Sequence, residues 1–185
     1  MEREICNLKL EASDIDARAQ RIKILLMDCD GVLTDGRLWL MAEGDEQKAF
    51  HARDGQGISL CHHAGLKTGI ITGRTSSAVE RRAQDLKMSY VRQEAKDKIK
   101  ALDEILAEAG VTANECAYIG DDVADIPVMQ RVALAVAVAD AVPETKQAAH
   151  YVTELDGGQG AVREVCDLIL KAQGKWDEVM ERFLV

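Results

Sequence analysis

The fold is decided by residues 24–36, ILLMDCDGVLTDG, in which four apolar side chains lead into two aspartates and a glycine. Alternate side chains of an extended chain point the same way, so Asp28 and Asp30 share one side where the expected strand ends. Two carboxylates this close repel each other, and burying them is costly unless a cation lies between them. The stretch therefore predicts a buried strand that ends at a cation site.

Apolar runs of strand length recur along the chain and alternate with amphipathic stretches of helical spacing. The runs fall at 22–27, 68–72, 89–91, 117–119, 133–138 and 151–153. Continuous apolar strands separated by helices are typical of a parallel sheet that is covered on both faces. We predict an α/β fold, a doubly wound (Rossmann-like) parallel sheet, in a single domain spanning 1–185.

One segment, residues 37–57, interrupts this alternation and reads as two short strands around the turn AEGDE. We expect a small β-hairpin inserted after the first strand, at the edge of the sheet where such folds bind ligands. Residues 175–185, KWDEVMERFLV, form a C-terminal tail. Its apolar side chains suit a contact with a neighbouring subunit and suit packing on the chain's own core equally well.

Composition limits the classes of partner. The 185 residues carry a formal charge of −9, which argues against nucleic acid or an anionic membrane as the main partner. The five cysteines are odd in number and include no CxxC pair, which suits a reducing compartment. The N-terminal stretch is charged and no apolar run approaches 18 residues, so we expect a cytoplasmic protein without signal peptide or membrane span.

Polar groups follow three of the expected strands, and the carboxyl ends of parallel strands meet at one edge of a sheet. These groups are Asp28-Cys29-Asp30, Thr72-Gly73-Arg74 and Asp121-Asp122 with the nearby Asp125, and Lys98 begins the helix before the last of them. Carboxylate oxygens suit Mg²⁺, while a lysine and a hydroxyl suit phosphoryl oxygens. Each motif alone is commonly a turn or a capping pair, but their order predicts a magnesium-assisted phosphate site.

The same residues resemble a known family. DCDGVLTDG, ITGR, Lys98 and YIGDDVADIPVM are similar to the four motifs of the haloacid dehalogenase-type phosphatases, and the resemblance covers residues 20–175. The hairpin in place of a cap domain, and GGQGAVREVCDLIL at 157–170, resemble the capless branch that acts on 3-deoxy-D-manno-octulosonate 8-phosphate in lipopolysaccharide precursor biosynthesis. The resemblance implies a phosphoric monoester hydrolase, with Mg²⁺ as its cofactor, that releases the free sugar acid and phosphate.

The resemblance also implies catalytic roles. Asp28 is the nucleophile, which takes the phosphoryl group as an aspartyl-phosphate. Asp30 protonates the leaving sugar oxygen and then deprotonates the hydrolytic water. Thr72 and Lys98 bind the phosphoryl oxygens.

For the metal, the resemblance implies three ligands. These are a side-chain oxygen of Asp28, the backbone carbonyl of Asp30 and the carboxylate of Asp121. Asp122 and Asp125 are expected to support these ligands from behind.

A sugar acid phosphate carries a carboxylate as well as its phosphate, so guanidinium groups are expected nearby. Arg74 and Arg82 are the candidates. By resemblance, Arg74 favours an eight-carbon substrate over the nine-carbon sugar acid 9-phosphate of a related branch. The resemblance also implies substrate contacts from Asp30, Lys98, Gly73 and the stretch His51, Ala52, Arg53, Asp54 and Gly55, although His51 stands where the family has asparagine.

Two alternatives stay open: a phosphatase for a nine-carbon 9-phosphate, and a non-enzymatic phospho-acceptor domain of the receiver type. A receiver also gathers aspartates, threonine and lysine at strand ends, but it needs no acid two residues after the nucleophile, so Asp30 distinguishes the two. A capless site lacks a wall against water. The apolar hairpin residues Leu38, Trp39, Leu40 and Phe50, together with the family resemblance, therefore predict a homotetramer.

Overall fold

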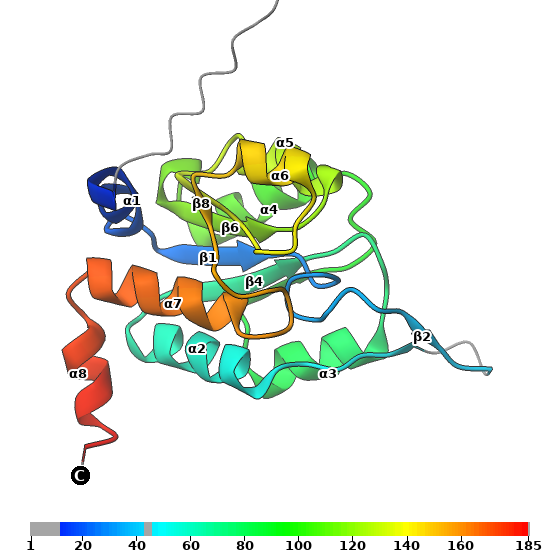
Figure 1. Ribbon diagram of the computed structural model, residues 1–185, viewed down its shortest axis with the longest axis horizontal. Helices are drawn as coiled ribbons and strands as arrows, with labels where there is room; N and C mark the ends of the chain where they lie inside the picture. The colour runs from blue at the N-terminus through cyan, green and yellow to red at the C-terminus, as the bar shows by residue number, and fades with distance from the viewer. Residues whose placement is uncertain (1–11, 43–45, 185) are drawn as a thin grey trace, which may run out of the picture.

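The computed structural model describes residues 12–42 and 46–184 (Figure 1). In this part of the chain, six strands form one sheet in the order β5-β4-β1-β6-β7-β8, with every neighbouring pair parallel. Their bounds are β1 (Ile24–Met27), β4 (Lys67–Ile71), β5 (Tyr90–Arg92), β6 (Cys116–Gly120), β7 (Leu134–Ala137) and β8 (Tyr151–Val152). Each lies in or overlaps one of the predicted apolar runs, so the predicted sheet is confirmed.

Helices cover both faces of this sheet (Figure 1). One face carries α2 (Ala52–His63), α3 (Ser77–Asp85) and α7 (Ala161–Ala172), and the other carries α4 (Lys98–Ala109), α5 (Ile126–Met129) and α6 (Pro143–Ala148). Two helices near the chain ends, α1 (Ala12–Ala19) and α8 (Trp176–Glu181), both contact α7. Short 3₁₀ turns at Ala113–Glu115 and Val123–Asp125 flank β6.

The centre of the sheet is buried on both sides, which explains why its strands read as unbroken apolar runs. All four residues of β1 are fully buried. The packing leaves no spare room, because a Cβ added at Gly69 of β4 would fall 2.8 Å from both Leu26 and Tyr90. β1 is therefore a rigid support for the loop that follows it.

The predicted hairpin is present as an antiparallel pair, β2 (Trp39–Leu40) with β3 (Glu46–Gln47), in a sheet of its own. It is shorter than the expected segment 37–57, because α2 already begins at Ala52. The middle of the turn AEGDE and the charged N-terminal stretch lie outside the described residues.

The C-terminal tail packs on its own chain. Val179 of α8 is only 3% exposed, whereas Phe183 and Leu184 beyond the helix remain exposed. Trp176, at the start of α8, lies against the side chains of Arg163 and Lys171 of α7. No helix in the described ranges combines the length and the apolar character needed to cross a membrane.

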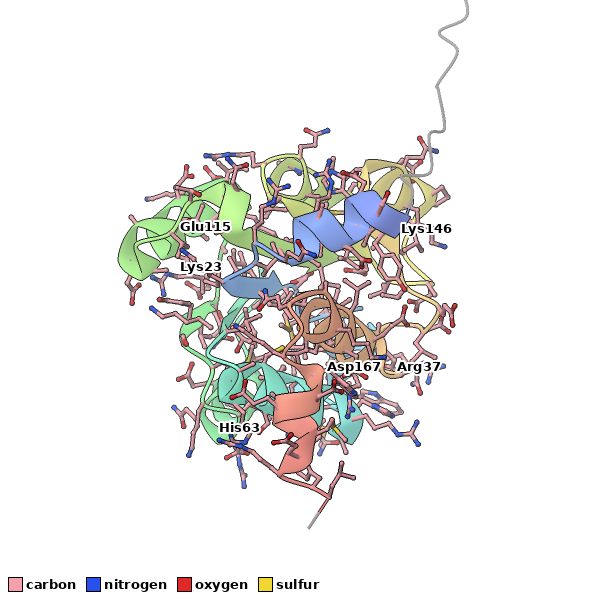
Figure 2. All side chains as sticks on the ribbon, turned by 90° about the vertical axis from the view of Figure 1, so that its left-hand side faces the viewer. Lys23, Arg37, His63, Glu115, Lys146 and Asp167 are labelled. Carbon is pink, nitrogen blue, oxygen red and sulfur yellow. The ribbon has the colours of Figure 1, made fainter. Side chains whose placement is uncertain are left out.

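Figure 2 shows the face of the molecule where β1 and β6 begin, with Lys23 and Glu115 labelled. There Lys23, just before β1, pairs with Glu115, just before β6, at 2.5 Å. A cavity of about 730 Å³ lies beside this pair, and its lining includes none of the predicted site residues.

His150 joins the edge strand β8 to β7. Its backbone N–H donates to the carbonyl of Ala135 (2.8 Å), and its Nδ1 accepts from the Ala135 N–H (2.9 Å). Burial, and then the nearby Arg18 guanidinium, hold the pKa of His150 below its ordinary value of 6.5, against a smaller opposing effect of Asp14. Protonation at Nδ1 would remove the acceptor that Ala135 uses.

Because the pKa of His150 is lower in the folded state, this histidine stabilises the fold fully above pH 6.5 and progressively less as the pH falls. Replacing His150 by Asn, whose amide oxygen accepts without titrating, removes this contribution, so the urea midpoint of His150→Asn should rise relative to that of the wild type as the pH falls from 7.5 to 5.5. His63→Asn, at an exposed histidine, is the matched control, and its midpoint should change with pH as that of the wild type does. The same change of midpoint with pH in all three proteins would contradict the assignment.

Candidate active site

The predicted site residues meet at the carboxyl ends of three adjacent strands. Asp28 follows β1 at the centre, Thr72 follows β4 on one side, and Asp121 follows β6 on the other. The Asp28 N–H donates to the carbonyl of Ile119 at 3.0 Å, so the first residue of the loop is still held by β6.

Three carboxylates in this region offer oxygens within 4.8 Å of one another: Asp28, Asp121 and Asp125. Burial, together with the charges of Asp125 and Asp28, raises the pKa of Asp121 to about 7. Burial also raises the pKa of Asp28 to about 6, although Lys98 counteracts it. Carboxylates destabilised in this way gain from a divalent cation placed between them.

Asp125 already uses both of its oxygens within the protein. Oδ1 accepts from Lys98 Nζ (2.7 Å) and Tyr118 Oη (2.6 Å), and Oδ2 accepts from the N–H groups of Asp121 (3.1 Å) and Asp122 (3.3 Å). By contrast, Asp121 Oδ1 is buried with no hydrogen-bond partner among the described residues. The residues fit a hard cation such as Mg²⁺. Asp28 and Asp121 have carboxylate oxygens available as ligands, whereas Asp125 uses its oxygens to hold the groups around them.

Gly31 lets the loops that carry Asp28 and Asp121 approach each other. Its φ is +88°, and a Cβ at this position would fall 2.1 Å from Asp121 Oδ2. Gly157, before α7, presses on the same loop from outside, since a Cβ there would lie 1.7 Å from the Gly31 carbonyl oxygen. Residues 157–160, GGQG, therefore form a strap that supports the Asp28 loop.

The predicted phosphate-binding groups also reach this site. Lys98, the first residue of α4, is 9% exposed, and its Nζ lies 3.1 Å from Asp28 Oδ2. Burial alone lowers the pKa of Lys98, but the carboxylates of Asp28 and Asp125 outweigh it and hold that pKa above its usual value. Thr72, at 2% exposed, lies at the end of β4 with its Oγ1 accepting from the Arg74 N–H at 3.4 Å.

The hairpin contributes two charged residues that the sequence did not single out, Lys48 and Glu46. The Lys48 side chain is 1% exposed, hydrogen-bonds to Asp30 Oδ1 and lies 3.4 Å from Glu46 Oε2. Arg74 contacts Glu46 Oε1, and its Nε lies 3.9 Å from Asp30 Oδ2. Asp30 Oδ2 is buried without a hydrogen-bond partner in the described part of the chain. Asp30 is thus held through one oxygen and retains the other for chemistry.

Two residues expected to touch the sugar also take part in helix packing. Asp54 is 1% exposed, and its Oδ1 accepts from the N–H of Arg163 at 2.8 Å. The N-cap of α7 is Gly160, which has no side chain, so the carboxylate of α2 caps α7 in its place. Gly55 faces Arg82, because a Cβ there would lie 2.3 Å from Arg82 Nη2.

The other predicted substrate contacts lie around the same edge. Arg82 donates to the His51 carbonyl at 3.4 Å, while its Nε is buried without a partner among the described residues. Ala52 and Arg53 are exposed in the first turn of α2. A cavity of about 400 Å³ opens beside the site and is lined by Gly73, Arg74, Thr75, Glu94 and Lys96.

Asp125 and its neighbour Asp122 offer a matched test of this geometry. Asp125 is fully buried, and all of its hydrogen-bond partners donate to it, so the NH₂ group of an asparagine would face donors. Asp125→Asn should therefore destabilise the protein by about 3–5 kcal/mol, as when one partner of a buried ion pair is lost. Asp122 is exposed and caps the following turn through Val123 N–H, a role that asparagine fills, so Asp122→Asn should change stability by less than about 0.5 kcal/mol. Urea unfolding measures both, and equal losses would contradict the assignment.

Comparison with known proteins agrees with this geometry. A family model for haloacid dehalogenase-like hydrolases matches residues 91–164, and the fold and the acidic site define a hydrolase of that class. The chain is 45% identical over 167 residues, 90% of this chain and 89% of the relative, to 3-deoxy-D-manno-octulosonate 8-phosphate phosphatase KdsC of Escherichia coli (strain K12). This chain belongs to the KdsC family of 3-deoxy-D-manno-octulosonate 8-phosphate phosphatases.

Solved structures of similar proteins share the whole architecture. The 3-deoxy-D-manno-octulosonate 8-phosphate phosphatase of Yersinia pestis is 47% identical, with a TM-score of 0.88 over 90% of each chain. The Moraxella catarrhalis phosphatase, solved in complex with a magnesium ion, a phosphate ion and KDO, is 39% identical, with a TM-score of 0.91 over 94% of this chain and 99% of that one.

Proposed function

We propose that this protein is a Mg²⁺-dependent phosphatase that hydrolyses 3-deoxy-D-manno-octulosonate 8-phosphate to KDO and phosphate. The observation that carries the proposal is the placement of Asp28 between Lys98 and Asp121, with Asp30 held beside it by Lys48. The KdsC relatives named for this substrate, and the magnesium, phosphate and KDO in the Moraxella catarrhalis structure, support the substrate and the metal.

In the first step, an oxygen of Asp28 forms a bond to phosphorus as the bond from phosphorus to the sugar oxygen breaks. Asp30 gives its proton to the leaving oxygen, and it then takes a proton from the water that cleaves the aspartyl-phosphate. Lys98 and Thr72 hold the phosphoryl oxygens. Asp28, Asp121 and the backbone carbonyl of Asp30 would hold the Mg²⁺, which supplies positive charge against the phosphate.

For the sugar, we propose contacts from Arg74 and Gly73, which line the cavity beside the site, from Arg82, and from the stretch His51, Ala52, Arg53, Asp54 and Gly55. Asp30 and Lys98 contact the substrate at its phosphate end. Guanidinium groups suit the substrate carboxylate. Arg74 favours the eight-carbon substrate over a nine-carbon 9-phosphate.

Replacing Asp28 by Asn keeps the size of the side chain but removes the nucleophile. Phosphate release from the 8-phosphate, measured with Mg²⁺, should fall by at least about 10³-fold in Asp28→Asn. The wild type should prefer the 8-phosphate to a nine-carbon sugar acid 9-phosphate by kcat/KM. Two outcomes would contradict the proposal. One is substantial phosphate release by Asp28→Asn, and the other is wild-type activity that requires a metal other than Mg²⁺.

We also propose a homotetramer built on the hairpin. Leu38, Trp39, Leu40 and Met41 are between 46% and 72% exposed in the single chain, on a segment with little core of its own. Such a contiguous apolar patch is costly in water unless it is covered.

We also propose a cytoplasmic location, since the cysteines in the described part of the chain carry free, buried thiols that suit a reducing compartment.

Light scattering should give four times the chain mass for the wild type. Leu40→Asp places a charge in the middle of the patch and should lower that mass, whereas Val152→Asp, at an exposed apolar residue of the edge strand β8, should not. A monomeric wild type would overturn the assembly and leave the chemistry of the site unaffected.

A further inference from the structure

A buried tyrosine lies directly beneath the candidate site. Tyr118 is fully buried in β6, where the sheet register sets it beside Leu26 of β1. Its hydroxyl donates to Asp125 Oδ1 at 2.6 Å and accepts from Lys98 Nζ at 3.5 Å. Tyr118, Asp125 and Lys98 thus form a closed triangle of hydrogen bonds, and the proposed mechanism gives Tyr118 no role in it.

Lys98 is shared between two carboxylates. Its Nζ lies 2.7 Å from Asp125 Oδ1 and 3.1 Å from Asp28 Oδ2. Asp125 Oδ1 accepts from both Tyr118 and Lys98, so the phenol supplies part of the stabilisation that this buried oxygen requires. Without the phenol, Asp125 Oδ1 would depend on Lys98 alone, and the ammonium would be drawn away from Asp28.

We propose that Tyr118 is a positioning residue for phosphoryl transfer: by donating to Asp125 Oδ1, it keeps the Lys98 ammonium at Asp28. This inference rests on the proposed function, in which Lys98 binds the phosphoryl oxygens. The tyrosine suits the role because its strand lies between β1 and β7, so the ring is fixed and its hydroxyl defines where the Asp125 carboxylate rests.

The test compares Tyr118→Phe with Tyr90→Phe, since each variant loses only one buried phenol hydroxyl. Tyr90 is 5% exposed at the start of β5, and its hydroxyl accepts from Lys67 Nζ at 3.2 Å rather than from any group of the site. With p-nitrophenyl phosphate and saturating Mg²⁺, Tyr118→Phe should lower kcat about tenfold and change KM by less than about threefold. Tyr90→Phe should leave both constants unchanged.

A double-mutant cycle with Lys98→Met then asks whether Tyr118 acts through the lysine. In the Lys98→Met background, adding Tyr118→Phe should change the residual kcat by less than about twofold. An unchanged kcat for Tyr118→Phe, an equal loss in both backgrounds, or failure of Tyr118→Phe to fold while Tyr90→Phe folds would overturn the inference. A wild type that releases no phosphate would instead overturn the proposed function, and this inference with it.

Discussion

The site depends on a single ammonium group, which is held among three carboxylates that repel one another. Asp28, Asp121 and Asp125 bring oxygens within 4.8 Å of one another where little water can screen them, and Lys98 lies within 3.1 Å of two of these residues. When all three carboxylates are ionised, one ammonium leaves two negative charges uncompensated, which matches one divalent cation. The buried strand β1, the close approach at Gly31 and the start of α4 at Lys98 all serve to hold this arrangement against repulsion.

Much of this follows from the sequence because the responsible signals are local. A strand buried on both faces must be apolar throughout, so the run 24–27 marks both the strand and the point where its loop begins. Parallel strands end at one edge, so Asp28, Thr72 and Asp121 are brought together by topology alone. The sequence shows the hairpin as a break in the alternation of strands and helices, but the predicted segment 37–57 runs past the hairpin into α2.

The other contacts of the site join segments that are distant in the sequence, and no periodic pattern in the sequence predicts them. Lys48 reaches Asp30 only because a hairpin of two short strands folds back over the site. Asp54 lies in a stretch that resembles a sugar contact, yet its carboxylate caps a helix 109 residues further along the chain. Tyr118 reads as one more member of an apolar strand, and only the fold turns its hydroxyl toward Asp125.

The strap at Gly157 also bears on how the protein is made. A polypeptide leaves the ribosome amino end first, so the Asp28 loop emerges long before the glycine that presses on Gly31. Until residue 157 and the helix after it have been translated, the Asp28 loop lacks this outer support, and Asp54 lacks the helix that it caps. The Asp28 loop therefore reaches its final packing only after more than a hundred further residues have been added to the chain.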